Sequence, residues 1–389
     1  MTRILEDSSI ASAPVVRAVD LHASGPLPVE TLPPVTRTGR GEAMQEIDAH
    51  EPRTRSAGSV QRTRELPDRE KAIGMYERML LIRKYEERIY YLFLEGSMPG
   101  TIHQSHGQEA CAVGMLYDLG PDDFMVSSHR PAGHDLAKGV PLRAMFCEMF
   151  GKKNGCCQGK GGAMHTGDIF VGALPANAIV GGNVPIAVGV GLAFKMRKRR
   201  NVVVAFFGDG ASNEGAFHEG ANAAALWDLP VILVCENNLY GASTRYERTC
   251  KVKDIADRAS AYGMPSQIVD GQDVLAVNEA AAKAIERARA GGGPTLLELK
   301  TYRFGGHSRS DARAYRTREE EANWAARDPI ATYRKILLDR NVVDESTLKA
   351  IESRVEQEIE DAVAYAKVSP DPRPEDALED VYWVGEARP

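Results

Sequence analysis

Three features that would place this 389-residue sequence in a familiar class are missing. No apolar run reaches the roughly 20 residues that a membrane-spanning helix needs. The net charge is −6, which excludes the broad basic face that binds nucleic acid or an anionic membrane. The six cysteines show no paired CxxC spacing, which argues against both a zinc site and a disulfide framework.

A secretory signal is also missing. The first residues, MTRILEDSSIASAP, are too acidic and too weakly apolar to act as one. The composition, 43% hydrophobic and 26% charged, is ordinary for a globular chain that can bury a large core. We therefore expect a cytoplasmic protein without a membrane or nucleic-acid partner.

The sequence divides into three parts. Residues 1–65 mix Pro, Arg, Ser and Glu without periodicity, which predicts a disordered N-terminal extension. Residues 66–330 begin with an amphipathic helix and continue with alternating glycine-rich loops and apolar runs, which predicts an α/β domain with a mostly parallel sheet flanked by helices. Residues 331–389 form a C-terminal helical region, with an amphipathic helix over 346–368.

Two apolar runs, NVVVAFF (201–207) and PVILVCE (230–236), are each followed by polar residues. The Ala- and Glu-rich segment between them is typical of a crossover helix that joins two parallel strands. Since parallel strands end at the same sheet edge, we expect Asp209 and Asn238 to lie side by side there, with oxygen atoms suited to Mg²⁺ or Ca²⁺. The residues alone also permit a plainer interpretation, in which Gly-Asp-Gly is a turn and the asparagines are caps.

Two other phosphate-binding motifs are incomplete. The segment GCCQGKGGAMH (155–165) contains Gly-Lys-Gly but lacks the hydroxyl residue that follows the lysine of a P-loop. The segment GDGASNEG (208–215) has Asn213 where a dinucleotide fingerprint requires its third glycine. Neither a P-loop nor a dinucleotide-binding motif is therefore predicted.

The spacing between Gly-Asp-Gly and Asn-Asn is more specific. Twenty-six residues separate Gly210 from Asn237, which is similar to the thiamine diphosphate motif GDG…NN. Residues from about 70 to 385 resemble the α subunit of the E1 component of 2-oxo acid and acetoin dehydrogenases. The segments that carry this resemblance are GQEACAVGM, GKGGAMH, IVGGNVPIAVG, GDGASNEG, ALWDLPVILVCENNLYG and GGHSRSDARAYRTREE.

The resemblance implies a thiamine-diphosphate-binding fold with thiamine diphosphate and Mg²⁺ as cofactors. In the family, the motif aspartate, the second asparagine and a backbone carbonyl bind the metal. These ligands correspond here to Asp209, Asn238 and Tyr240. The N–H groups of Gly210 and Ala211, at the start of the crossover helix, are expected to face the phosphates.

Further cofactor contacts follow from other matched segments. SSHRPAGH supplies Arg130 as a phosphate-binding guanidinium and His129 where tyrosine is common. His103 corresponds to a histidine that approaches the cofactor from the loop before the GQEA helix. An isolated histidine is more often structural, but its place in a matched segment favours a role at the site. In NAIVGG, the backbone groups of Ala178 and Val180 correspond to those that hold the aminopyrimidine ring.

The resemblance also implies catalytic residues and partners. His307 matches an active-site histidine on a mobile loop and, with His103, is the expected catalytic group. A glutamate that activates the cofactor comes from a separate E1 β subunit in the family, so we expect an α2β2 heterotetramer that transfers acyl groups to a lipoyl-bearing E2 protein. The small-residue segment 184–194 suits a helix buried between subunits. Ser308 and Ser310 match positions phosphorylated in mitochondrial relatives, but are interpreted here as polar loop residues.

The substrate is less specified. Ala132 is typical of branched-chain members, whereas AFFGDGASNEGAFHEGAN is more similar to acetoin enzymes. Acetoin or pyruvate therefore ranks first, and branched-chain 2-oxo acids follow. A noncatalytic scaffold subunit is the alternative from another class, although assembly alone requires none of Asp209, Asn238, Arg130 and His307.

Overall fold

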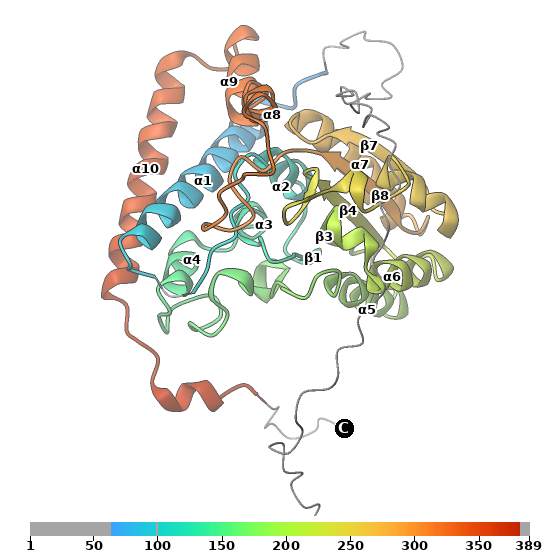
Figure 1. Ribbon diagram of the computed structural model, residues 1–389, viewed down its shortest axis with the longest axis horizontal. Coiled ribbons are helices and arrows are strands. Elements are labelled where there is room, and N and C mark those ends of the chain that lie inside the picture. The colour runs from blue at the N-terminus through green and yellow to red at the C-terminus, as the bar shows by residue number, and fades with distance from the viewer. Residues whose placement is uncertain (1–63, 99, 382–389) are drawn as a thin grey trace, which may run out of the picture. The chain divides into compact units, whose positions relative to one another are not determined.

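The centre of the protein is a parallel sheet, seen in a computed structural model that describes residues 64–98 and 100–381 (Figure 1). Six strands follow the order β2-β1-β3-β4-β8-β7, and every neighbouring pair is parallel. A short antiparallel ribbon, β5-β6, follows β4. The strands are β1 (Phe124–Val126), β2 (Ala173–Leu174), β3 (Val203–Gly208), β4 (Val231–Asn237), β5 (Tyr240–Gly241), β6 (Thr244–Arg245), β7 (Ser266–Asp270) and β8 (Thr295–Lys300).

Helices cover both faces of this sheet, which confirms the predicted α/β class. The α-helices of the described residues are α1 (Arg69–Leu94), α2 (Glu109–Leu116), α3 (Ala132–Lys138), α4 (Leu142–Met149), α5 (Asn183–Met196), α6 (Gly215–Leu226), α7 (Val274–Arg289), α8 (Arg318–Ala325), α9 (Pro329–Asp339) and α10 (Glu345–Val368).

The residues of β3 alternate between two apolar cores, one on each face of the sheet. Val204 and Phe206 belong to the core that includes α1, α2 and α7. Val203, Ala205 and Phe207 pack with α5 and α6, which lie together below the strands in Figure 1. Because both faces are covered, β3 and β4 read as continuous apolar runs rather than alternating ones.

The two amphipathic helices predicted from periodicity are present. Helix α1 is capped by the Asp68 side chain and buries Met75, Met79 and Ile89. Helix α10 packs against α1 and α4. The N-terminal extension predicted for residues 1–65 lies outside the described residues apart from Arg64 and Glu65, and the domain boundaries remain predictions. Within the described residues, no helix combines the length and apolar character needed to cross a membrane.

The crossover between β3 and β4 differs from the prediction in one detail. Gly210 and Ala211 lie in a 3₁₀ turn (Gly210–Asn213), and helix α6 begins only at Gly215. The two N–H groups therefore belong to the turn and not to the α-helix itself. The strands are paired in register from Val203 with Val231 to Gly208 with Glu236, so Asp209 and Asn237 follow directly at one sheet edge.

Candidate functional site

Asp209 is the most unusual carboxylate at this edge. Its side chain is 2% exposed, and its Oδ2 atom has no hydrogen-bond partner among the described residues. Burial raises the pKa of Asp209 to about 6, although the Arg303 charge opposes the increase. A buried carboxylate oxygen without a partner is costly unless a cation or donor completes it. This oxygen therefore fits the predicted metal ligand.

The two asparagines have different tasks. Asn237 donates from Nδ2 to Glu298 at 2.7 Å and accepts from the Leu239 N–H at 3.1 Å. These two contacts fix the loop that follows β4. Leu239 has a φ of 73°, a conformation rarely adopted by a residue with a side chain. Asn238 donates from Nδ2 to Gln108 at 3.1 Å, and its Oδ1 lies 3.4 Å from the Tyr240 nitrogen.

The loop after Asn238 closes back onto the Gly-Asp-Gly turn. A Cβ atom placed on Gly210 would lie 3.2 Å from the Gly241 Cα, and one placed on Gly241 would lie 3.9 Å from Asp209 Oδ2. The turn with Asp209 thus lies next to the loop with Asn238 and strand β5, which begins at Tyr240. The three residues carry oxygen atoms of the kind that Mg²⁺ binds, and their role as ligands remains a prediction.

Three histidines from distant segments meet beside an arginine. The ring centroids of His103, His129 and His307 are 5.1–5.6 Å apart. Burial, reinforced by the Arg130 charge, lowers the pKa of His103 and His307 to about 4 and that of His129 to about 2. His103 Nδ1 and His129 Nε2 are buried without a partner among the described residues. The three rings are neutral at physiological pH and have free capacity for a polar ligand.

Arg130 is a buried cation, and its partners in the described part of the chain carry no negative charge. It donates to the Gln104 carbonyl at 2.7 Å, to the His307 carbonyl at 2.7 Å and to His307 Nδ1 at 3.0 Å. The side chain is 5% exposed, and burial lowers its pKa to about 9. A buried guanidinium with only neutral partners favours an anionic ligand.

Arg303 is a second such cation, and the sequence analysis missed it. It donates to the carbonyls of Gly305 and Ala242 and to the Tyr315 hydroxyl. Burial lowers its pKa, and the charge of Arg316 adds to this effect. An arginine three residues after β8 and four residues before His307 is the sequence signal that could have identified it.

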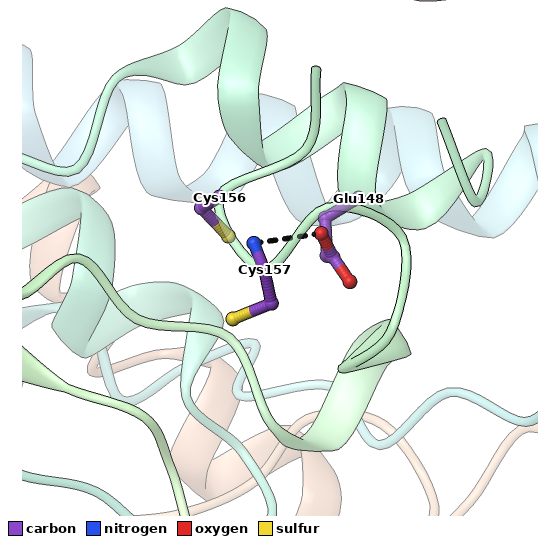
Figure 2. A group of neighbouring side chains, drawn as sticks. All are labelled: Glu148, Cys156 and Cys157. Atoms are coloured by element: carbon purple, nitrogen blue, oxygen red, sulfur yellow. Dashed lines mark hydrogen bonds between the residues drawn. The ribbon is translucent and has the colours of Figure 1, made fainter. Parts of the chain in front are cut away.

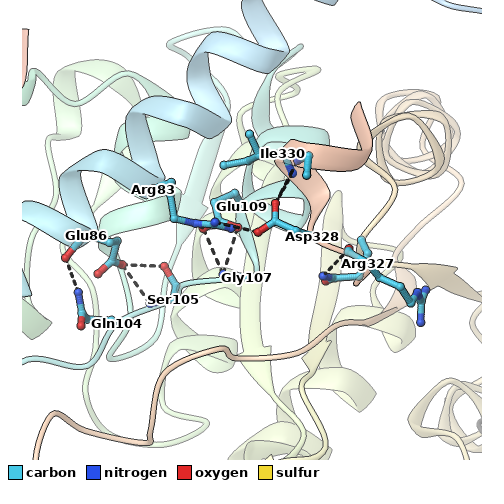
Figure 3. A network of polar contacts seen from close by, with 11 residues as sticks. Arg83, Glu86, Gln104, Ser105, Gly107, Glu109, Arg327, Asp328 and Ile330 are labelled. Atoms are coloured by element: carbon cyan, nitrogen blue, oxygen red, sulfur yellow. Dashed lines mark hydrogen bonds and ion pairs between the residues drawn. The ribbon is translucent and has the colours of Figure 1, made fainter. Parts of the chain in front are cut away.

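A polar network holds the loop that carries His103 and Gln108 (Figure 3). Glu109 accepts from Arg83 at 2.5 Å and from the Gly107 N–H at 3.1 Å, and Arg83 also contacts Asp328 at 2.8 Å. Nearby, Glu86 accepts from the Ser105 N–H and hydroxyl. Glu86, a charged residue on the buried side of α1, is therefore an anchor for this loop.

The segment with Ala178 and Val180 lies next to the turn that follows Asp209, because a Cβ atom placed on Gly181 would lie 3.7 Å from the Ala211 carbonyl oxygen. The Asn177 N–H donates to the Ser127 carbonyl at 3.2 Å, at the end of β1. The side chain of Val180 is exposed, and the described contacts do not link it or Ala178 to the three histidines. Their roles remain predictions. Ser308 and Ser310 contact each other through their hydroxyls at 3.3 Å on the loop after His307.

Comparison with known proteins agrees with this geometry. The sequence profile of the dehydrogenase E1 component matches residues 77–375. The chain is 48% identical over 314 residues to the α subunit of acetoin:2,6-dichlorophenolindophenol oxidoreductase from Bacillus subtilis, covering 80% of this chain and 94% of the relative. The corresponding subunit from Cupriavidus necator is 45% identical, with 81% and 95% covered.

A plant relative is similar over a comparable length. The chloroplastic pyruvate dehydrogenase E1 component subunit alpha-3 of Oryza sativa subsp. japonica is 42% identical over 323 residues, covering 81% of this chain and 76% of the relative. The matched region contains all the strands and the residues gathered at their carboxyl ends. This chain therefore belongs to the dehydrogenase E1 component family.

Proposed function

We propose that this chain is the α subunit of a thiamine-diphosphate-dependent E1 enzyme that cleaves acetoin or a 2-oxo acid. Two observations carry the proposal: among the described residues, the buried Asp209 Oδ2 has no hydrogen-bond partner, and the buried Arg130 and Arg303 donate to no carboxylate. The charge of Arg303 acts on Asp209. A cation bound at Asp209 and a diphosphate bound at the arginines would satisfy both. The site needs a positive charge at Asp209 and a negative charge at the arginines, and a magnesium-bound diphosphate supplies both.

The site residues fall into two groups, those proposed to bind the metal and those proposed to contact the phosphates and the thiamine rings. Asp209, Asn238 and the Tyr240 carbonyl would hold Mg²⁺, and the N–H groups of Gly210 and Ala211 would face the phosphates. When bound, thiamine diphosphate supplies a nucleophilic carbon for the substrate carbonyl and a sink for the electron pair released on cleavage. The residues proposed for phosphate and ring contacts are His103, His129, Arg130, Ala178, Val180, Arg303 and His307.

His307 is the proposed proton donor or acceptor during acyl transfer. Arg130 Nη2 donates to His307 Nδ1, so we assign the proton of the neutral ring to Nε2. The second contact of Arg130, to the His307 carbonyl, fixes the backbone of the same residue. Arg130 thereby orients the ring, and burial together with the Arg130 charge lowers the pKa of His307 so that the ring is neutral. His103 faces the same ring and is the second candidate.

The partners are proposed from the relatives. The names of the bacterial relatives describe them as α subunits, which supports a second subunit for this chain as well. We propose an α2β2 heterotetramer in which the β subunit contributes the activating glutamate, and a lipoyl-bearing E2 protein as acceptor. The cytoplasm is the proposed compartment, on the sequence argument alone.

Acetoin is the preferred substrate because two relatives that cover most of the chain are named for it. Pyruvate follows, since the plant relative is named for pyruvate dehydrogenase. Branched-chain 2-oxo acids remain an alternative because of Ala132. Turnover of acetoin, pyruvate and 3-methyl-2-oxobutanoate by the reconstituted complex, with a dye as electron acceptor, ranks the three.

Calorimetry of the complex reconstituted with its β partner tests the cofactor site. Thiamine diphosphate should bind only with Mg²⁺, and Asp209→Ala should abolish binding, whereas Asp122→Ala at an exposed position should not change it. Arg303→Met should weaken binding by about 10- to 100-fold, the effect of a charge-assisted hydrogen bond, and exposed Arg313→Met is the matched control. No Mg²⁺-dependent binding to the wild-type complex would favour the scaffold alternative.

A further inference from the structure

Two adjacent cysteines, Cys156 and Cys157, lie in the turn after α4, away from the residues discussed above. Both are half-buried, whereas Cys111, Cys147 and Cys235 are fully buried. The two sulfur atoms and a carboxylate oxygen of Glu148 all lie within 4.8 Å of one another (Figure 2). The two thiols are therefore close together and partly open to solvent.

Glu148 organises this turn through the backbone. One carboxylate oxygen accepts from the N–H groups of Cys157 and Gly159, both at 2.9 Å. The other accepts from Gly161 and Gly162 at 2.8 and 3.0 Å. Four N–H donors occupy this buried carboxylate, so only the two thiols remain free for chemistry. A structural zinc ion takes four protein ligands, and this group does not supply them.

The chemistry of the pair is asymmetric. The Cys156 thiol can donate to the Cys157 sulfur, and this contact lowers the pKa of the Cys157 thiol. The same contact raises the pKa of Cys156. Cys157 is thus the first of the two to ionise, with a second thiol directly beside it. An accessible cysteine that ionises readily beside a resolving cysteine is the arrangement of oxidation-sensitive sites.

We propose that Cys156 and Cys157 form a reversible thiol-oxidation site that responds to hydroperoxides. The Cys157 thiolate attacks the peroxide oxygen, which breaks the O–O bond and yields a sulfenic acid and hydroxide. Cys156 sulfur then attacks the Cys157 sulfur, losing its proton and displacing water. Overall, two thiols and hydrogen peroxide give one disulfide and two water molecules.

The adjacent positions make such a disulfide easy to reduce. Neighbouring Cα atoms across a trans peptide are about 3.8 Å apart. Unstrained disulfides usually join Cα atoms at least about 4.4 Å apart. A disulfide in this turn is therefore strained, and strained disulfides are the labile, regulatory ones.

Oxidation would also release a neighbouring segment. The Cys157 thiol donates to the carbonyls of His165 and Gly167 at 3.2 and 3.9 Å. His165 Nδ1 in turn contacts the Ala176 carbonyl at 3.0 Å, and the Ala176 N–H donates to Thr166 at 2.9 Å. This segment leads into 178–180. This step rests on the proposed cofactor site: oxidation of Cys157 would release this segment and thereby weaken cofactor binding.

Peptide mass spectrometry tests the thiol chemistry without any cofactor. Trypsin cleavage after Lys153 and Lys160 leaves both cysteines in the single peptide 154–160. After hydrogen peroxide treatment of the full-length protein, this peptide should lose two hydrogen atoms, resist alkylation and recover on reduction. Cys157→Ser should prevent the change, and Cys156→Ser should leave a sulfenic acid on Cys157 that dimedone traps. Cys250→Ser, at another half-buried cysteine, is the matched control and should oxidise normally at 154–160.

Two outcomes would overturn the proposal. If peroxide modifies Cys250 but peptide 154–160 still has two alkylatable thiols, the pair is not the sensitive site. A disulfide between two chains through this peptide would exclude the internal step. The link to the cofactor has its own test, because saturating thiamine diphosphate and Mg²⁺ should shift the thiol–disulfide equilibrium of peptide 154–160 in a glutathione redox buffer toward the two thiols if oxidation weakens cofactor binding. An unchanged equilibrium in a complex that binds the cofactor would refute that link alone.

Discussion

Replacing Asp209 by asparagine measures how much burying an ionised carboxylate at the proposed metal site lowers the free energy of unfolding. Burial raises the pKa of Asp209 from its ordinary 3.8 to about 6, and no donor or cation among the described residues pairs with Oδ2. Without cofactor, the folded protein therefore holds this proton more tightly than the unfolded chain does. The contribution to stability is complete below pH 3.8 and is lost as the pH rises through about 6.

The difference between these two pKa values corresponds to about 3 kcal/mol at neutral pH. Asparagine has nearly the same shape and carries no charge. We expect Asp209→Asn to increase the free energy of unfolding of the cofactor-free protein by about 3 kcal/mol at pH values above about 7, and by less near pH 5. The same variant should lose Mg²⁺-dependent thiamine diphosphate binding, so stability and function change in opposite directions.

Urea unfolding followed by circular dichroism, at about pH 5 and about pH 7.5, measures the effect. Asp123→Asn is the matched control because Asp123 is equally buried but paired, accepting from Arg289 at 2.5 Å and from the Val202 N–H at 3.0 Å. That variant should lower the free energy of unfolding. Equal unfolding free energies for wild type and Asp209→Asn at both pH values would refute the reasoning, since they would mean that the carboxylate is already solvated or paired.

Three further predictions address the catalytic loop, the anchoring network and assembly. His307→Ala should still bind thiamine diphosphate and Mg²⁺, because Asp209, Asn238 and Arg130 carry the main diphosphate contacts, but it should lose about 10²- to 10⁴-fold in turnover, with a larger loss for a lipoyl-protein acceptor than for a dye. Equal losses with both acceptors would place His307 in an earlier step. Arg83→Met leaves Glu109 and Asp328 without their cation and should cost about 3–5 kcal/mol in thermal or urea unfolding. Arg88→Met removes a more exposed ion pair and should cost less than about 1 kcal/mol; similar costs for the two variants would contradict the network's role. Sedimentation of the chain with its β partner should give a particle of four chains, which a fully active α monomer would disprove.

The local pattern of residues was sufficient to predict the sheet and its functional edge. The apolar runs of β3 and β4 and the segment between them indicated parallel strands, and the structure pairs them in parallel register. Because parallel strands end at the same edge, the positions of Asp209 and Asn238 followed from chain order alone. The apolar stripes of α1 and α10 could also be predicted from the sequence, because the helical repeat is a local property of the chain.

The cluster of His103, His129 and His307 depends on contacts that no local pattern contains. These residues lie on three loops, and Arg130, next to His129, contacts the other two through the Gln104 carbonyl and through the His307 carbonyl and ring. The resemblance suggested each residue separately, but their contact, their neutrality and the partnerless nitrogens come only from the packed loops.

Arg303 and Gln108 show the same limit more clearly. Arg303 reads in sequence as one of many charged residues, and only tertiary packing buries it without a carboxylate. Gln108 precedes α2 and becomes a site residue because the loop from β4 places Asn238 within 3.1 Å of it. Periodicity determines which residues of a helix or strand are buried, because it repeats along the chain. The contacts of loop residues depend on segments far away in the chain, so only the folded arrangement decides them.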